Sequence, residues 1–152
     1  MAEPRIRRAA AADADVLAEY NIRLARETED ISLDPATVRA GVAAALADEA
    51  KGTYFVAEVD DVLVGQLLVT TEWSDWRNGP MWWIQSVYVA PDYRGAGVFR
   101  ALYEHTVEAA RGEGVPAIRL YVEQEYDIAQ SVYGHLGMKP SGYVVYDLEP
   151  VE

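Results

Sequence analysis

The sequence predicts an α/β fold in which a mixed sheet is covered by helices on both faces. Strand-like and helix-like patterns alternate along the 152 residues, and such an order is best satisfied when helices cover both faces of the sheet. The length fits one domain spanning residues 1–152. Hydrophobic residues make up 51% of the chain, so we expect it to be ordered over most of its length.

Each element is indicated by its own pattern. Runs of β-branched and aromatic residues indicate strands, and apolar residues three and four apart indicate helices. Asp34 before Pro35 is a good helix start, because proline suits the first helical position. Asp60 and Asp61 predict a hairpin between two strands. The predicted order is a strand at 6–10, a helix capped by Asp13, a helix after Asp34, strands at 54–59, 62–73 and 81–89 with a turn-rich loop at 74–80, a helix at 98–111, a strand at 117–123, a helix at 128–136 and a strand at 142–149.

Composition excludes several classes of function. The chain has no cysteine, which removes disulfides, thiolate metal ligands and a cysteine nucleophile. His105 and His135 are its only imidazoles, so we expect no metal site. A formal net charge of −12 argues against nucleic acid, whose phosphates need a basic face. We find neither an apolar run of ~20 residues nor the apolar centre of a signal peptide, and therefore expect a soluble, cytoplasmic protein with no membrane partner.

The stretch APDYRGAGVFRALY, residues 90–103, passes from a predicted strand to a predicted helix through a glycine-rich turn. A helix N-terminus presents unpaired N–H groups and a partial positive charge. Gly95 and Gly97 let another group approach the backbone closely, and Arg94 and Arg100 add charge. These features predict a phosphate or pyrophosphate site. The alternative is that the glycines serve only a tight turn.

Two other phosphate-binding motifs do not fit this turn. A P-loop needs a lysine after its last glycine, but the chain's lysines, Lys51 and Lys139, both lie elsewhere. A dinucleotide-binding fingerprint needs three glycines in an early strand–helix–strand unit. This turn lacks the third glycine and comes late in the chain.

Residues 87–103 resemble motif A of the GNAT superfamily of acyl-CoA N-acyltransferases, in which Gln or Arg is followed three residues later by Gly and five residues later by Gly or Ala. Phe99 departs from the motif, since it stands where Gly or Ala is usual. The positions that fit are Arg94, Gly95, Ala96, Gly97 and Val98.

YDIAQSVYGHLGM, residues 126–138, is similar to motif B of the same family. Ala129, Tyr133 and Gly137 fall at the family's spacing, followed by Met138, and Tyr126 replaces the usual asparagine. The order of elements also matches the GNAT fold, so the resemblance spans nearly the whole chain. It implies a central, mostly antiparallel sheet with splayed central strands.

The resemblance implies acetyl-CoA as co-substrate. In GNAT enzymes the pantetheine arm lies in the opening beside the splayed strand, which assigns the backbone groups of Val87 and Val89 to it. The amides from Gly95 to Arg100 would hold the pyrophosphate, and Arg94 and Arg100 would add charge. Phe99 falls on the apolar face of the helix, so we expect its ring in the core and its N–H still able to donate.

Tyr133 resembles the family's general acid, which protonates the departing thiolate. The alternative is that its ring only packs, because it lies on the apolar face of its helix. Without cysteine, a thiol-linked acyl-enzyme is impossible, so direct attack by the acceptor amine in a ternary complex is the simpler route. An alkyl amine with a pKa of about 10.4 arrives protonated, so a carboxylate or an ordered water must take its proton.

All four tryptophans lie between Trp73 and Trp83, beside Glu72 and Asp75. Aromatic faces and carboxylates together suit a cation, so this hairpin is predicted to contact a cationic acceptor through Trp73 and Asp75. Either carboxylate can serve as general base, with Glu72 preferred, whereas Gln85 can only position a water. The alternative is a tryptophan-rich hairpin that packs between sheet and helix or forms a dimer seam.

Glu27 and Glu29 lie in the acidic run RETED, residues 26–30, after the first helix. In GNAT proteins this region forms a wall of the acceptor pocket, so Glu27 is a further predicted contact of a cationic acceptor. The alternative is a solvated helix end.

The sequence therefore predicts an N-acetyltransferase that acts on a primary amine of a small-molecule or amino-acid-like acceptor. A homodimer is common in the family and is expected as one outcome. The alternative is a non-catalytic acyl-CoA-binding module, which Phe99 and Tyr126 favour as departures from the motifs. A nucleotide-phosphate binder is a third reading, and ATP would then stabilise the fold more than CoA does.

Overall fold

The computed structural model describes residues 2–151, which divide into two compact units on either side of the bond between Leu120 and Tyr121. The predicted single domain spanning residues 1–152 stays a prediction. None of the helices in residues 2–151 combines the length and apolar character that a bilayer span requires.

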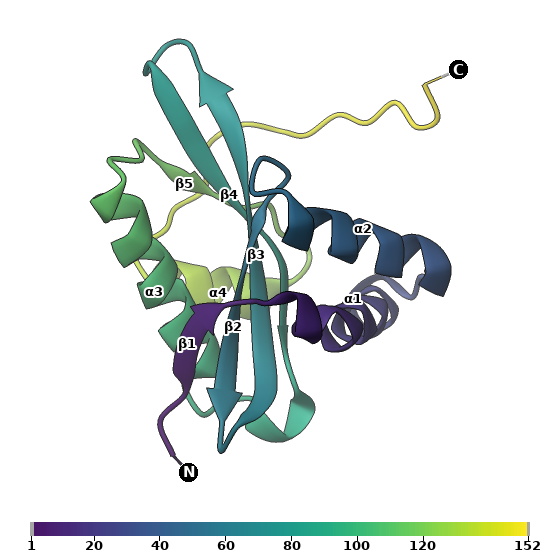
Figure 1. The fold of residues 1–152 in the computed structure, drawn as a ribbon. Helices are drawn as coiled ribbons and strands as arrows, with labels where there is room; N and C mark the ends of the chain where they lie inside the picture. Colours follow the sequence, from purple (N-terminus) through teal and green to yellow (C-terminus); the bar gives the residue numbers. More distant parts are fainter. Residues whose placement is uncertain (1, 152) are drawn as a thin grey trace. The chain divides into compact units, whose positions relative to one another are not determined.

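The first unit (Figure 1) contains β1 (Arg5–Arg8), the 3-10 helix η1 (Ala11–Asp13), α1 (Ala14–Glu29), α2 (Pro35–Ala47), β2 (Thr53–Val59), β3 (Val62–Ser74), β4 (Gly79–Val89), the 3-10 helix η2 (Pro91–Tyr93), α3 (Val98–Gly112) and β5 (Ile118–Arg119).

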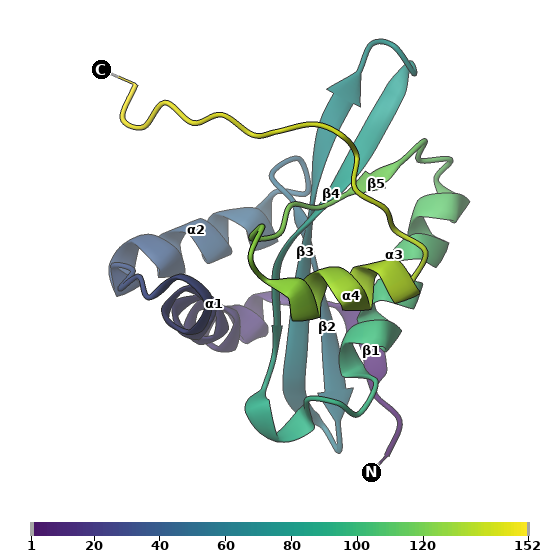
Figure 2. The same cartoon turned by 180° about the vertical axis from the view of Figure 1, so that it is seen from behind.

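The strands form one mixed sheet in the order β1-β2-β3-β4-β5. The pairs from β1 to β4 are antiparallel, and β4 and β5 run parallel. Asp60 and Asp61 have φ values of 51° and 64°, the left-handed conformation that a two-residue hairpin turn requires, which confirms the predicted β2–β3 hairpin. The predicted loop at 74–80 is shorter in the structure, because β3 and β4 extend until only residues 75–78 separate them. The tip of this β3–β4 hairpin projects beyond the helices of the unit (Figures 1 and 2).

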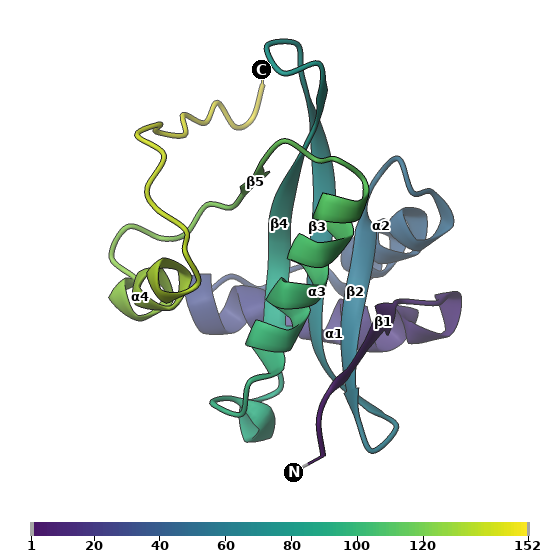
Figure 3. The ribbon, with the colours of Figure 1, turned by 90° about the vertical axis from the view of Figure 1, so that its left-hand side faces the viewer.

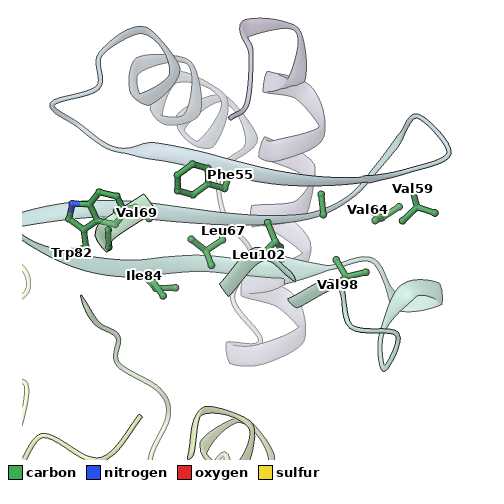
Figure 4. Close-up of a cluster of buried hydrophobic side chains, with 11 residues drawn as sticks. Phe55, Val59, Val64, Leu67, Val69, Trp82, Ile84, Val98 and Leu102 are labelled. Carbon is green, nitrogen blue, oxygen red and sulfur yellow. The ribbon is translucent and has the colours of Figure 1, made fainter. Parts of the chain in front are cut away.

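Helices cover both faces of the sheet, as predicted (Figure 1). On one face α3 packs through Val98 and Leu102 against a cluster that includes Phe55 (Figure 4). On the other face Leu17 of α1 packs against Val56, with α2 in the same cluster. Successive residues of β2 thus point to opposite faces and are buried on both, which explains why its sequence is apolar almost throughout.

Two aspartates position the helices of the second face in different ways. Asp34 is the N-cap of α2, and its carboxylate accepts the N–H of Thr37 over 3.0 Å, as the sequence predicts. Asp13 stands at the N-cap of α1 but makes no cap hydrogen bond there. Its carboxylate instead binds the guanidinium of Arg7 over 2.8 and 3.0 Å, so the predicted capping role of Asp13 is wrong.

The second unit contains α4 (Asp127–His135), which begins one residue before the helix predicted at 128–136. The strand predicted at 117–123 is reduced to β5, which has two residues. Residues 142–149 form no strand, and the large apolar side chains of that segment are exposed. The predicted strand is therefore not seen in the described part of the second unit, whose only regular element is α4, so that no strand is present there to pair with it.

Candidate active site

The turn from β4 into α3 has the geometry of an anion site. Gly95 and Gly97 have φ values of 74° and 85°, in the left-handed region that glycine adopts without strain. A Cβ at either position would meet no atom within 4 Å, so the space beside the turn is open. From Val98 onward, the first N–H groups of α3 have no partner inside the helix, and the helix dipole adds a partial positive charge.

Gly65 of β3 sets how closely α3 approaches the sheet. A Cβ at Gly65 would lie 2.9 Å from Cγ1 of Val98 and 3.3 Å from Cδ1 of Leu102. An isolated glycine inside a strand pattern indicates such a close approach, and this signal was available in the sequence. Phe99 packs partly buried against the same cluster, with its ring centroid 6.1 Å from that of Tyr103, which confirms the expected place of its ring.

Arg94 connects the glycine turn to α1 through side-chain contacts. Its Nε donates to the carbonyl of Val89 over 2.8 Å, its Nη2 lies 3.1 Å from Oε1 of Glu27, and its guanidinium lies 5.2 Å from the ring centroid of Tyr88. Hydrogen bonds from Tyr88 and Arg94 hold the pKa of Glu27 below its ordinary value. The carboxylate of Glu27 is therefore charged at neutral pH and holds Arg94 in place.

Arg100 lies in the first turn of α3, where its Nε donates to Oε1 of Glu104 over 2.9 Å. Its side chain is 70% exposed, and that of Arg94 is 48% exposed. Exposed ion pairs contribute only about 0–1 kcal/mol, so a pyrophosphate at the α3 N-terminus can compete with both carboxylates for the two guanidinium groups.

β4 changes its pairing at Ser86. The register with β3 shifts beside this residue, and Ser86 has a φ of 51°, which together mark a β-bulge. On its other edge, β4 pairs with β5 at residues 82–83. Figure 3 shows β4 continuing toward η2 after β5 has ended. Val87 and Val89, the predicted backbone contacts of the pantetheine arm, lie in this continuing stretch, and the carbonyl of Val89 already accepts from Arg94.

A chain of buried hydrogen bonds runs behind the bulge. The side chain of Gln66, which is fully buried, donates through Nε2 to the carbonyl of Ser86 over 2.9 Å and to Oδ1 of Asn21 over 2.8 Å. Asn21 donates to the hydroxyl of Tyr54 over 3.0 Å, and burial raises the pKa of Tyr54. The Oε1 of Gln66 is buried with no hydrogen-bond partner among the described residues.

A cavity of about 510 Å³ opens onto this chain of hydrogen bonds, and we call it the α1–α2 cavity. Asn21, Tyr54 and Ser86 reach it from the sheet and α1, and Glu29 and Lys51 are exposed lining residues. Its volume lies within the range of small-molecule sites. Sequence reasoning did not find this cavity. Gln66, a polar residue within the apolar run VLVGQLLV, was the available signal.

Glu27 and Glu29 occupy different hollows. Residues two apart on a helix point about 200° away from each other. Glu29 therefore lines the α1–α2 cavity, whereas Glu27 lines a separate hollow of about 350 Å³ with Tyr88 and Arg23. The predicted contact of Glu27 with the acceptor stays a prediction, and its observed partner is Arg94.

The tryptophan hairpin lies at the far end of the β3–β4 ladder. Glu72 stands opposite Met81, and its Oε1 accepts from Nε1 of Trp83 over 2.7 Å. Ser86 lies five positions along β4 from Met81, a distance of about 16 Å. Trp73 is 64% exposed on the same end. The structure thus places Glu72 and Trp73 away from the bulge, and neither lines the α1–α2 cavity.

The remaining predicted acceptor contacts are also dispersed. Asp75 lies in the exposed turn at 75–78, beside Trp76, which is 86% exposed. Gln85 precedes the bulge and donates to Oγ1 of Thr70 over 2.6 Å. Trp82 is buried in the core under α3. The four tryptophans therefore do not form one cage.

Tyr133 belongs to α4 in the second unit. The last residues of motif B end this helix. Gly137 has a φ of 94°, and the N–H of Met138 donates to the carbonyl of Tyr133 over 3.1 Å. Burial raises the pKa of Tyr133, so its phenol is protonated at neutral pH. A protonated phenol is what a general acid requires.

The comparison with known proteins decides the family. The sequence matches the acetyltransferase (GNAT) family over residues 17–138, which is most of the chain. The chain belongs to this family. The predicted family, GNAT fold and enzyme class, an acetyltransferase that uses acetyl-CoA, are thereby confirmed.

Solved structures of other acetyltransferases share this GNAT fold. A possible acetyltransferase from Clostridium difficile 630 is 42% identical, with a TM-score of 0.92 over 98% of this chain and 99% of that one. A predicted acetyltransferase from Clostridium acetobutylicum, solved with acetyl-CoA, is 17% identical, with a TM-score of 0.78 over 95% of this chain and 96% of that one, and shows likeness of fold alone. An uncharacterised N-acetyltransferase of Methanocaldococcus jannaschii is 31% identical over 87 residues, which are 57% of this chain and only 38% of that relative.

Proposed function

We propose that this GNAT protein transfers the acetyl group of acetyl-CoA to the primary amine of a small acceptor. The observation that supports this most directly is that two features follow each other along the chain. They are the edge of β4 beyond residues 82–83, which β5 does not pair, and the N-terminus of α3, where the space beside Gly95 and Gly97 is open. Together they offer backbone groups to an extended arm and N–H groups to a diphosphate, which is the shape and charge pattern of CoA.

Acetyl-CoA would bind along the features predicted from the sequence. The N–H groups from Gly95 to Arg100 hold the diphosphate, and Arg94 and Arg100 neutralise part of its charge. The backbone of Val87 and Val89 pairs with the pantetheine arm, and Arg94 releases the Val89 carbonyl for this purpose. Each of these is a contact of this chain's own residues, and none requires a metal.

The α1–α2 cavity is the proposed acceptor site. It meets β4 at Ser86, next to Val87, whose backbone we assign to the pantetheine arm, so an amine in the cavity lies beside the part of the strand that holds the thioester carrier. Its Asn21 and Tyr54 supply polar groups for an amine. The predicted contacts at Trp73, Asp75, Gln85 and Glu27 would then concern a part of the acceptor outside this cavity.

The proposed reaction is a direct transfer. The neutral amine nitrogen attacks the thioester carbonyl, a C–N bond forms and the C–S bond breaks. The thiolate takes a proton from the hydroxyl of Tyr133, and the amine loses one proton. No acyl-enzyme on a thiol can form, because the chain has no cysteine.

The group that accepts the amine's proton stays open between a carboxylate and a water. Glu72 is the base predicted from the sequence, but its carboxylate is held by Trp83 about 16 Å of strand from the bulge. We infer that a water beside the Tyr54 hydroxyl is the other candidate for this proton, because Tyr54 lines the proposed acceptor cavity. Replacing Glu72 by Gln separates the two, since only the first route loses turnover.

A cytoplasmic location and a homodimer also stay proposals. The first is the expectation from the sequence patterns, and the second is measured by sedimentation. The rival function is a non-catalytic acyl-CoA-binding module, and one observation favours it. Phe99 places a ring in the first turn of α3, where the family has Gly or Ala.

One experiment tests the proposed function. Isothermal titration measures CoA affinity, and thiol release from acetyl-CoA is followed against a panel of amines for wild type and the Arg94→Glu variant. The expected result is CoA binding that the charge reversal weakens at least tenfold, with turnover on at least one amine. Tight CoA binding without turnover on any amine supports the rival, and absence of CoA binding overturns both.

A further inference from the structure

The walls of the α1–α2 cavity are mainly apolar. Most of its lining comes from α1, α2 and the segment between them, with further residues from β2, β3 and β4, and the apolar side chains include Leu24, Ala25, Ile31, Leu33, Val38 and Leu68. Burial of apolar surface is worth about 0.8 kcal/mol for each methylene group. The walls therefore reward an acceptor whose body is hydrocarbon.

The polar groups of the cavity gather at one end. Tyr54 is 5% exposed, and it is joined to Asn21 and through Gln66 to the carbonyl of Ser86. This end holds one phenol and one amide but no carboxylate. It suits a single amine, which can exchange hydrogen bonds with a hydroxyl and an amide.

The charged residues of the lining are few and opposite in sign. Glu29 and Lys51 are both exposed, and Nζ of Lys51 lies 3.7 Å from Oδ2 of Asp48. A polyamine needs several carboxylates along its length, and the cavity lining supplies one. The protein's formal net charge of −12 is therefore not concentrated at this site.

We infer that the acceptor is a small monoamine with an apolar body, an alkylamine or arylalkylamine rather than a polyamine. This inference rests on the proposed function, because the same cavity is taken as the acceptor site. The apolar walls disfavour an ammonium ion, so the amine binds in its neutral, nucleophilic form. A carboxylate base beside the amine is then unnecessary, which agrees with the absence of a carboxylate from the polar end of the cavity lining.

Acceptor specificity is tested with a series of linear amines from n-propylamine to n-hexylamine, beside 2-phenylethylamine and spermidine. We expect kcat/KM to rise about fourfold for each added methylene until the cavity is full. Spermidine should lie at least tenfold below n-hexylamine. A flat series, or a preference for spermidine, overturns the inference while leaving the proposed function intact.

Two variants locate the effect in the cavity. Leu33→Glu and Ile31→Glu place a carboxylate in its wall, at positions that are half-buried and exposed and so tolerate the change. Both should lower kcat/KM for n-hexylamine at least tenfold and raise that for spermidine, with KM for acetyl-CoA unchanged. Val62→Glu is the matched control, because Val62 is 56% exposed and lies outside the cavity. An equal effect from Val62→Glu contradicts the assignment.

A binding measurement distinguishes failure of this inference about the acceptor from failure of the proposed function. If no amine releases thiol, calorimetry of n-hexylamine with the CoA-saturated protein still tests the cavity. Binding that Leu33→Glu weakens at least tenfold supports the inference on its own. Absence of n-hexylamine binding, or binding that the variant leaves unchanged, overturns it.

Discussion

The side-chain amide of Gln66 donates a hydrogen bond to the backbone carbonyl of Ser86 over 2.9 Å. This bond joins β3 to the bulge of β4, where the regular ladder between the two strands is interrupted. The same nitrogen holds Asn21 of α1 over 2.8 Å, so one buried side chain sets the relative positions of the bulge and the polar end of the α1–α2 cavity.

Replacing Gln66 by Met keeps most of the side-chain volume and removes both donated hydrogen bonds. Each bond contributes about 1 kcal/mol to the stability of the fold. Because the bulge and Asn21 are then no longer held in position, we expect kcat/KM for the amine to fall at least tenfold. CoA affinity should stay within twofold, because the α3 N-terminus is not touched. Steady-state kinetics and calorimetry measure the two effects.

Gln66→Glu distinguishes a positioning role from a general loss of packing. An ionised carboxylate cannot donate to the Ser86 carbonyl, whereas a protonated one can donate a single hydrogen bond. Activity relative to wild type should therefore increase as the pH falls. A ratio that is independent of pH in a stably folded variant contradicts the positioning role.

Gly65→Ala tests the close approach of α3 to the sheet. The added Cβ would lie 2.9 Å from Val98 Cγ1, so the Val98 side chain or the helix that carries it must shift, and the free energy of unfolding should fall by about 1–3 kcal/mol. CoA should bind more weakly, because the first turn of α3 moves. Gly41→Ala in α2 is the control, since no atom lies within 4 Å of its Cβ, and it should stabilise the fold by about 0.5–1 kcal/mol. Equal effects in chemical denaturation would refute the packing argument.

Arg100→Ala and Arg111→Ala form a matched pair at the two ends of α3. Each arginine makes an exposed ion pair on its own helix, with Glu104 and Glu108 respectively. The first variant should weaken CoA binding about threefold to tenfold, more strongly at low salt, because Arg100 lies beside the proposed diphosphate site. The second should leave affinity unchanged. Similar losses in both would point to a general effect of net charge.

The Arg7–Asp13 pair predicts acid sensitivity of the fold. The guanidinium of Arg7 lowers the pKa of Asp13 from its ordinary value of 3.8. A carboxylate with a lowered folded-state pKa contributes stability that is present above pH ~4 and is lost as the pH falls through the folded value. Asp13→Asn should cost about 1–2 kcal/mol at pH 7 and progressively less below pH 4.

The control for the acid-sensitivity prediction is Asp48→Asn, which breaks an exposed pair with Lys51 and should cost less than ~0.5 kcal/mol at pH 7. Urea denaturation at pH 7 and pH 3 measures both variants. A cost of Asp13→Asn that is the same at both pH values would exclude the ion pair as its cause.

Tyr133→Phe removes the proposed general acid without changing the shape of the side chain. We expect kcat to fall at least tenfold with CoA affinity unchanged. Because burial raises the pKa of Tyr133 above 10, the wild type should lose activity through this group only at strongly alkaline pH, and the variant should lack that limb. Tyr103→Phe is the control, since burial raises its pKa as well and it packs against Phe99. Unchanged kcat in Tyr133→Phe would show that the ring only packs.

The sequence by itself determined the order of the elements as far as α4, the GNAT motifs and the glycine turn, because these depend on local signals. Gly95 and Gly97 take left-handed φ values that glycine adopts without strain, and Asp34 caps α2 through a contact three residues away. Strands at the end of the chain were not determined in this way. Residues 142–149 have the composition of a strand, but a strand exists only where another strand pairs with it.

The tertiary structure alone decided which polar residues meet. Asn21, Tyr54, Gln66 and Ser86 come from four different elements, and no spacing in the sequence relates them. Conversely, the tryptophans and acids of residues 72–83 are close in sequence, but the two strands of the hairpin carry them to the end of the ladder away from the bulge. Local conformation follows from neighbouring residues, whereas a cavity follows from how sheet and helices pack, which is set by contacts between residues far apart in the chain.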